Sequence, residues 1–144
     1  MLDEIDVTGI CHCGKIKITA KVKKSETRAC HCTDCQKFSG APFRAIAVAP
    51  RGKFSIQGTP KEYIKIGDSG NKRIQAFCGK CSTSLYSTSP NREKFSLRTG
   101  FLDQREYLIP KKHIYGRSSV KWLKNIYNDN WVTTMPDSEP FEFE

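Results

Sequence analysis

The sequence predicts a mainly β fold made of small antiparallel sheets, and three observations support this. Short runs in which apolar and polar residues alternate recur along the chain. Glycine and proline interrupt these runs, as turns between antiparallel strands require. In residues 15–23, apolar side chains alternate with polar ones, mostly lysine, which is the pattern of a strand with one buried face. We therefore expect a β-dominated domain.

Each expected strand is supported by its own alternation and by the turn residues that end it. We expect strands at residues 7–10, 16–22, 43–49, 53–57, 62–66, 73–77, 84–87, 95–99 and 112–115. Residues 25–28 are expected to form a polar connector, and residues 36–40 a short helical turn that Gly40 ends. Residues 120–123 are expected to be a short helical or extended segment. Aromatic residues of the acidic tail are expected to lie over the body of the domain: Trp131, Phe141 and Phe143.

Length and composition fit one domain. The chain has 144 residues, of which 38% are hydrophobic and 27% charged, as is typical of a globular protein that buries a core. No internal repeat, low-complexity segment or linker divides it, so we expect a single domain over residues 1–144. No run of about 18 apolar residues occurs, and the acidic start of the chain has no apolar signal segment. We therefore expect no membrane span and a cytoplasmic location.

The chain is basic, with a net charge of +9 from 24 Lys and Arg against 15 Asp and Glu. A basic surface attracts anions, whether small acids, acidic lipids or nucleic acid, although such charge also serves solubility alone. The basic residues are scattered rather than gathered in one block. A dedicated nucleic-acid-binding arm is therefore not expected.

Seven cysteines form three closely spaced groups, C-H-C at 11–13, C-H-C-T-D-C at 30–35 and C-G-K-C at 78–81. A disulfide scaffold normally has an even number of cysteines and a secretory signal. Close spacing in a reducing compartment instead favours metal ligation, and thiolates are typical zinc ligands. A redox-active C-x-x-C is the main alternative.

Seven thiols can be shared between two zinc ions as four plus three. A structural zinc has four protein ligands, whereas a catalytic one has three and an open position. The closed site would use Cys11, Cys13, Cys78 and Cys81, and the open site Cys30, Cys32 and Cys35. Alternatively, one zinc uses the central three cysteines and one outlying cysteine, which leaves three thiols without a role. Gly14 is expected to have a positive φ that lets the first two thiols point the same way.

Four other polar residues lie in or near these motifs. His12 and His31 each stand between two cysteines, where the middle side chain of C-x-C projects away from the metal, so both imidazoles are expected in water. A metal or substrate contact by His31 is the alternative. His113 is expected to be structural, with a pocket role as the alternative. Asp34 is expected to be solvated or to cap the following turn, with a proton relay as the alternative.

The order and spacing of the motifs resemble the glutathione-dependent formaldehyde-activating enzyme family, which also includes centromere protein V. The resemblance spans residues 8–122 and is carried by G-I-C-H-C-G, by C-H-C-T-D-C followed by F-S-G-A-P, and by F-C-G-K-C. It implies a β-tent fold, a structural zinc on the four outer cysteines and a catalytic-type zinc on the central three. Ser82 departs from the family, which usually has glycine there, and we expect this to alter the turn more than ligation.

A zinc ion held by three thiolates is a weak Lewis acid that is well suited to exchanging a further thiolate. Such a thiolate is a nucleophile at neutral pH, where a free thiol with a pKa of about 8.5 is mostly protonated. The resemblance implies a carbon–sulfur lyase that forms S-hydroxymethylglutathione from glutathione and formaldehyde, with Cys30, Cys32 and Cys35 as its catalytic site. The basic residues nearest the motifs in sequence, which are candidates for binding this anionic thiol, are Lys37, Arg44 and Arg73.

Two alternatives to this function stay open. One is a non-enzymatic zinc module that binds glutathione or an anionic macromolecule, as the net positive charge allows. The other is a related enzyme that uses another thiol or another aldehyde. For the enzyme, the expected partners are small molecules, a thiol such as glutathione and an aldehyde; a membrane is not expected, and nucleic acid is not favoured.

Overall fold

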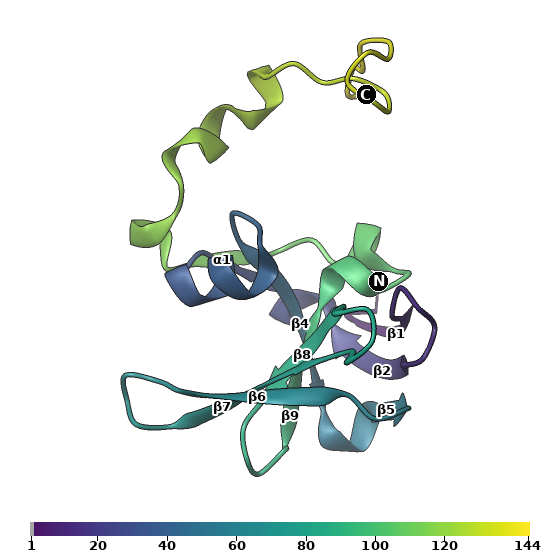
Figure 1. Cartoon of the computed structure of the whole chain (residues 1–144), viewed down its shortest axis with the longest axis vertical. Coiled ribbons are helices and arrows are strands. Elements are labelled where there is room, and N and C mark those ends of the chain that lie inside the picture. Colours follow the sequence, from purple (N-terminus) through teal and green to yellow (C-terminus); the bar gives the residue numbers. More distant parts are fainter. Residues whose placement is uncertain (1) are drawn as a thin grey trace.

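Two β-sheets make up the fold in the computed structural model, which describes residues 2–144 (Figure 1). The smaller, antiparallel sheet has the strand order β1-β2-β5 and consists of β1 (Glu4–Ile10), β2 (Lys17–Lys23) and β5 (Phe54–Gln57). The larger sheet has the order β10-β3-β4-β9-β8-β7-β6. Its strands are β3 (Arg28–Cys30), β4 (Arg44–Pro50), β6 (Lys61–Ile66), β7 (Lys72–Phe77), β8 (Ser84–Thr88), β9 (Lys94–Arg98) and β10 (Lys112–Ile114). Neighbouring strands are antiparallel except for the parallel pair β10 and β3.

One α-helix and six short 3-10 helices connect or follow the strands. The α-helix is α1 (Thr33–Ser39). The 3-10 helices are Lys24–Glu26, Arg51–Lys53, Thr99–Phe101, Arg105–Tyr107, Gly116–Ser118 and Lys121–Asn128. No helix in residues 2–144 is both long and apolar enough to cross a membrane.

The two faces of the larger sheet differ in chemistry, because side chains alternate between faces along each strand. The strand register places small and apolar residues on the face that packs against the smaller sheet: Ala47, Ala49, Ala76, Tyr86, Phe95 and Leu97. Phe54 of the smaller sheet stacks on Phe95 with ring centroids 3.9 Å apart. The core of the domain therefore lies between the two sheets.

The opposite face, which we call the polar face, carries a thiol, four guanidinium groups and small polar side chains. Beside the apolar Ile46 and Val48 of β4, its residues are Arg28, Cys30, Arg44, Arg73, Gln75, Ser87, Ser96 and Arg98. Gln75, Ser87, Ser96 and Arg98 are nonetheless buried. The larger sheet therefore packs the core on one face and offers polar side chains for a functional site on the other.

All nine strands expected from the alternation are present, with ends that differ by a few residues. The strand β3 was not expected, because residues 25–28 were assigned to a connector. Its three residues are too few to show alternation, and pairing with β4 and β10 on either side makes it a strand. The helix α1 begins three residues earlier than expected and ends, as expected, at Gly40, whose φ is 64°.

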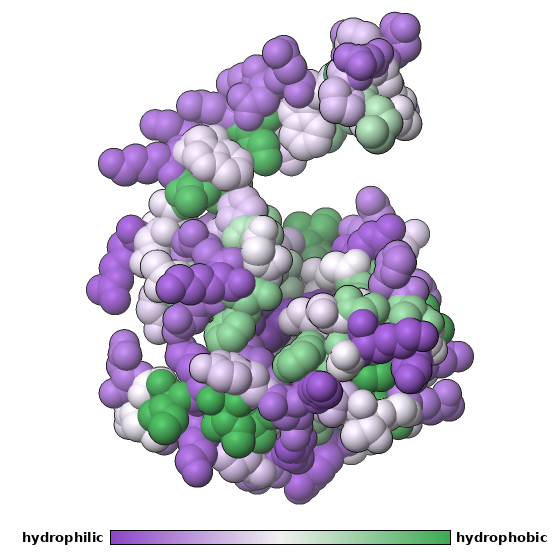
Figure 2. Space-filling view, viewed as in Figure 1, coloured by the Kyte–Doolittle hydropathy of each residue, from purple (hydrophilic) through white to green (hydrophobic). Residues whose placement is uncertain are grey.

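The expectation that the acidic tail covers the domain is wrong. From residue 120 the chain leaves the body, and Figure 1 shows residues 120–144 as an arm that extends away from the sheets. Its aromatic rings pack on one another instead, with Phe143 at the centre and Tyr127, Trp131 and Phe141 each about edge-on to it. Figure 2 shows hydrophilic side chains over much of the arm's outer surface.

Candidate functional site

Four cysteines from two distant turns form the first site, which we call the quartet. Cys11 and Cys13 lie on the turn between β1 and β2, and Cys78 and Cys81 on the turn between β7 and β8. All four Sγ atoms lie within 4.8 Å of one another. The Sγ of Cys13 is 3.7 Å from that of Cys11 and 3.6 Å from that of Cys78. Four sulfurs around a tetrahedral ion at about 2.3 Å would be ~3.8 Å apart, so this group can hold a metal.

The backbone of both turns is shaped around these sulfurs. Gly14 has the expected positive φ of 85°, and Ser82 has a φ of 67°, which is why glycine suits that position. The backbone N–H of Ile16 donates to Cys11 Sγ at 3.2 Å. The Thr83 hydroxyl lies 3.2 Å from Cys81 Sγ, and its hydrogen bond lowers the pKa of that thiol to about 5. Because one turn belongs to each sheet, the quartet joins the two sheets.

The three central cysteines form the second site, which we call the trio. Cys30 ends β3, Cys32 is the N-cap residue of α1, and Cys35 lies in the first turn of that helix. Their Sγ atoms lie within 4.8 Å of one another, and this group has three potential ligands among the residues that the structure describes. The trio can therefore hold a metal with one ligand fewer than the quartet.

The trio thiols differ in acidity because their surroundings differ. Burial works against ionisation of Cys32, but the backbone N–H of Cys35 donates to its Sγ at 3.3 Å and the neighbouring thiols also donate, which lowers its pKa. Burial raises the pKa of Cys35 to about 12, although the Arg44 guanidinium opposes this. Without a metal, the Cys32 thiol is therefore more acidic than the Cys35 thiol, since the pKa of Cys32 is lowered and that of Cys35 is raised.

The trio opens into a cavity of about 390 Å³. The arginines and small polar residues of the polar face form one side of it, including Arg28, Arg44 and Gln75. Residues 114–118 form another side, and Tyr115 there has the left-handed φ of 56°. A strained residue at this position is typical of a site whose shape is fixed by its surroundings. The cavity is large enough for a small molecule next to the trio.

The histidine and aspartate expectations are partly wrong. His12 is exposed, as expected, but His31 is buried rather than in water. Its Nε2 lies 2.9 Å from His113 Nδ1, because the parallel pairing of β10 with β3 brings the two rings together. Burial, together with the nearby His113, lowers the pKa of His31. Asp34 forms an ion pair with Lys65 of β6 at the rim of the cavity, so it is not simply solvated.

Of the three basic residues singled out from the sequence, Arg44 and Arg73 line the trio cavity and Lys37 does not. Sequence reasoning missed two further arginines of the polar face, Arg28 and Arg98. Arg28 stands two residues before Cys30, so it shares a strand face with that ligand, and this spacing could have revealed it. Arg98 had no such signal, since the order of strands in the sheet places it there.

Fold and site together define a mainly β protein with two cysteine groups that can hold metal ions, one of them facing a basic cavity. The chain belongs to the glutathione-dependent formaldehyde-activating enzyme family, whose sequence model matches residues 6–118. The match ends near residue 120, where the chain leaves the body of the fold.

Curated relatives agree with this membership, and a solved structure shares the fold. A relative from Sordaria macrospora, whose name places it in the same family, is 32% identical over 101 residues, which are 65% of this chain and 42% of the relative. A second, from Podospora anserina, is 29% identical over 77 residues, 54% of this chain and 36% of the relative. This chain thus spans about two fifths of the length of these relatives. The crystal structure of a Rhodobacter sphaeroides protein shares the fold, with a TM-score of 0.56 at 17% identity over 74% of this chain and 98% of that chain.

Proposed function

We propose that this protein is a zinc-dependent carbon–sulfur lyase that joins a thiol such as glutathione to formaldehyde. In this proposal residues 1–144 act as one zinc-binding domain, with a structural zinc on the quartet and a catalytic-type zinc on the trio. The observation that carries the proposal is a three-cysteine group facing a cavity lined by arginines. Because seven reduced thiols are needed, we place the protein in the cytoplasm.

The donor sets fit zinc. All seven potential ligands are sulfur, which zinc binds readily, and the quartet has the sulfur spacing of a tetrahedral site. Zinc bound by three thiolates supplies a weakly acidic centre at which an incoming thiol stays deprotonated and nucleophilic. The family name and the names of the relatives support glutathione and formaldehyde as the two reactants.

The reaction itself needs no redox partner. The thiol sulfur attacks the carbonyl carbon, so that a carbon–sulfur bond forms while the electron pair of the carbon–oxygen π bond moves to oxygen. That oxygen takes up one proton, which balances the proton that the thiol loses. The product is an S-hydroxymethyl adduct, and the reverse reaction releases formaldehyde.

The chain's own residues bind and orient the thiol in this proposal. The guanidinium of Arg44 is held by a 2.9 Å hydrogen bond to Gln75 Oε1 and lies 5.6 Å from the centre of the Phe38 ring. It therefore faces the cavity beside Cys35 in a fixed position and offsets the negative charge of the thiolates. Phe38, Ile114 and Tyr115 line the same cavity and offer apolar contacts to the thiol.

The test is the rate at which formaldehyde exchanges with its glutathione adduct, measured by NMR exchange spectroscopy. Wild-type protein should accelerate exchange, and Cys32→Ser should abolish the acceleration because it removes a trio ligand. Lys37→Gln is the matched control, since this residue lies on the same helix but does not line the cavity. An exchange rate that wild-type protein leaves unchanged rejects the enzyme, and binding of glutathione without acceleration would instead support a carrier.

A further inference from the structure

Four arginines gather on the polar face although they come from four different strands. Arg28 lies on β3, Arg44 on β4, Arg73 on β7 and Arg98 on β9. The register explains the arrangement, because Ile46 of β4 pairs with Arg28 on one side and with Arg98 on the other. We call these four residues the arginine cluster.

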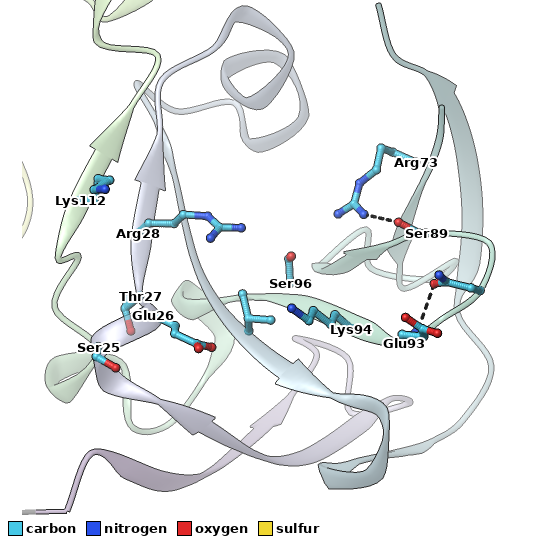
Figure 3. A pocket seen from close by; sticks show the side chains of 12 residues that line it. Ser25, Glu26, Thr27, Arg28, Arg73, Ser89, Glu93, Lys94, Ser96 and Lys112 are labelled. Atoms are coloured by element: carbon cyan, nitrogen blue, oxygen red, sulfur yellow. Dashed lines mark hydrogen bonds between the residues drawn. The ribbon is translucent and has the colours of Figure 1, made fainter. Parts of the chain in front are cut away.

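Two members of the arginine cluster, Arg28 and Arg73, lie where two cavities meet. The trio cavity of about 390 Å³ and a neighbouring cavity of about 640 Å³ share Arg28, Arg73 and Ser96 as lining residues, so they form one groove. Figure 3 shows Arg28 and Arg73 pointing toward each other across this groove, with Ser96 and Lys94 on the strand between them. The groove runs from the trio, past this pair of guanidinium groups, to Lys112.

Neutral oxygen atoms are the hydrogen-bond acceptors of the cluster. Gln75 Oε1 accepts from both Arg44 and Arg98, at 2.9 and 3.0 Å. Ser87 Oγ accepts from Arg73 at 3.2 Å and from Arg98 at 3.4 Å. Among residues 2–144, no ion pair involves any member of the cluster. Neutral dipoles therefore position the guanidinium groups of Arg44, Arg73 and Arg98, and no carboxylate in the described part of the chain neutralises the charge of any of the four arginines.

Burial makes this lack of a counter-charge costly. Arg98 is 6% exposed, and the Nε atoms of Arg28, Arg44 and Arg98 are buried without a hydrogen-bond partner. Burial, followed by the charge of Arg44, lowers the pKa of Arg98 to about 9, and the pKa of Arg73 is lowered for the same reasons. Buried cations without a partner are normally avoided in proteins, so such a cluster indicates a missing anion.

The remaining charges of the groove do not supply that anion. The acidic residues that line it are Glu26, Asp34, Asp68 and Glu93, and they are matched in number by Lys65, Lys94, Lys112 and Arg117. A divalent metal on three thiolates leaves one net negative charge, and it lies on the side of Arg44 and Arg98. The unbalanced positive charge of the groove therefore lies mainly on Arg28 and Arg73.

We propose that this groove binds a ligand with at least two negative charges on carboxylate or phosphate oxygens, which are held between Arg28 and Arg73. Guanidinium groups bind such oxygens in a bidentate manner, and hydrogen bonds to Ser87 and Ser89 already hold Arg73 in place. The ligand extends from this oxyanion site toward the trio, where its sulfur reacts; this second part rests on the proposed function. Acid-bearing thiols are thereby selected over neutral ones, which lack a group for the arginines.

The oxyanion site is tested by calorimetric titration of the full-length, zinc-loaded protein with two probes. Inorganic phosphate presents phosphate oxygens, and S-methylglutathione presents two carboxylates but no free thiol. At least one probe should bind saturably. Arg28→Gln and Arg73→Gln should each weaken this binding at least tenfold, and Arg28→Lys less, because it keeps the charge but loses the bidentate geometry. Arg105→Gln, an exposed arginine outside both cavities, should have no effect.

Each outcome has a defined meaning. Binding of phosphate alone identifies a phosphate-bearing ligand, and binding of S-methylglutathione identifies a carboxylate-bearing one. The site is rejected if neither probe saturates, or if the arginine variants bind as wild type does. If a variant fails to fold, phenylglyoxal modification of Arg28 and Arg73 in the wild type replaces it, and phosphate or S-methylglutathione should slow that reaction at least tenfold. Neither probe has a free thiol, so neither can form an adduct with formaldehyde. The titration therefore tests the oxyanion site independently of the lyase activity.

Discussion

The quartet and the trio differ in how the chain assembles them. The quartet unites thiols from turns in two different sheets, and Cys13 and Cys78 are separated by 65 positions. The trio comes from one short stretch whose geometry β3 and α1 already hold. A metal at the quartet would therefore hold distant parts of the fold together, whereas a metal at the trio would add little to structure. The contrast teaches that the location of the ligands, as well as their number, separates a structural metal site from a reactive one.

The largest effect is expected from a substitution that removes a cysteine of the quartet. Cys78→Ser removes a ligand at the junction of the two sheets, where a structural zinc can contribute roughly 10 to 16 kcal/mol to folding. We expect an unfolded or insoluble protein, whereas Cys35→Ser should keep the fold and lose one metal. Thermal unfolding and metal content per chain measure both effects. Equal damage from the two substitutions would contradict the division of roles.

A chelator should remove metal from the trio before it removes metal from the quartet. The trio has three ligands and an accessible cavity, so a chelator should empty it first while the circular dichroism spectrum stays unchanged. The quartet should follow only with loss of β structure, because Cys11 and Cys78 are almost fully buried. Metal release and circular dichroism followed together check this. A single step in which all metal leaves with unfolding would disprove the order.

The trio should bind metal more weakly as the pH falls. Burial raises the pKa of Cys35 to about 12, so the metal-free site holds this proton at neutral pH and must release it on ligation. Affinity should therefore rise with pH, by about tenfold per unit for each proton displaced. Competition with a chelator at two pH values one unit apart, with the quartet still loaded, measures the slope. A flat dependence would mean that Cys35 is not a ligand.

The smallest expected effect concerns the turn that carries Cys81. Ser82 has a φ of 67°, a conformation that costs an L-residue roughly 1 kcal/mol and glycine much less. Ser82→Gly should therefore raise the free energy of unfolding by about 0.5–1 kcal/mol. Ser55→Gly on the exposed side of β5 is the control and should lower it by a similar amount. Urea unfolding of the metal-loaded protein measures both, and a shift of the same sign in both variants would refute the turn argument.

The sequence was a good guide where a structure depends on local pattern. Alternation predicted nine strands, and the two cysteine groups that the spacing suggested are the ones that come together. Local pattern also predicted the glycine conformations at Gly14 and Gly40. The strands, the turns and the trio each depend on residues that are close in the sequence, whereas the quartet joins two such turns that are 65 positions apart.

The sequence was a poor guide where strand order decides. Arg73 and Arg98 meet Arg28 only because β7 and β9 belong to the same sheet as β3, which alternation does not reveal. His31 was expected in water because the middle side chain of C-x-C projects away from the metal, yet the parallel strand β10 brings His113 against it. The tail was expected to lie over the body of the domain, but its aromatic rings pack on one another instead.

The parallel pairing of β10 with β3 also fixes the order in which the molecule is completed during synthesis. The last quartet ligand is Cys81, but the backbone N–H of His31 bonds to Ile114 at 3.0 Å, and residues 114–118 form one wall of the trio cavity. At typical translation rates these residues follow Cys81 by a few seconds. A nascent chain can thus complete the quartet, which joins the two sheets, before residues 114–118 add their wall to the trio cavity.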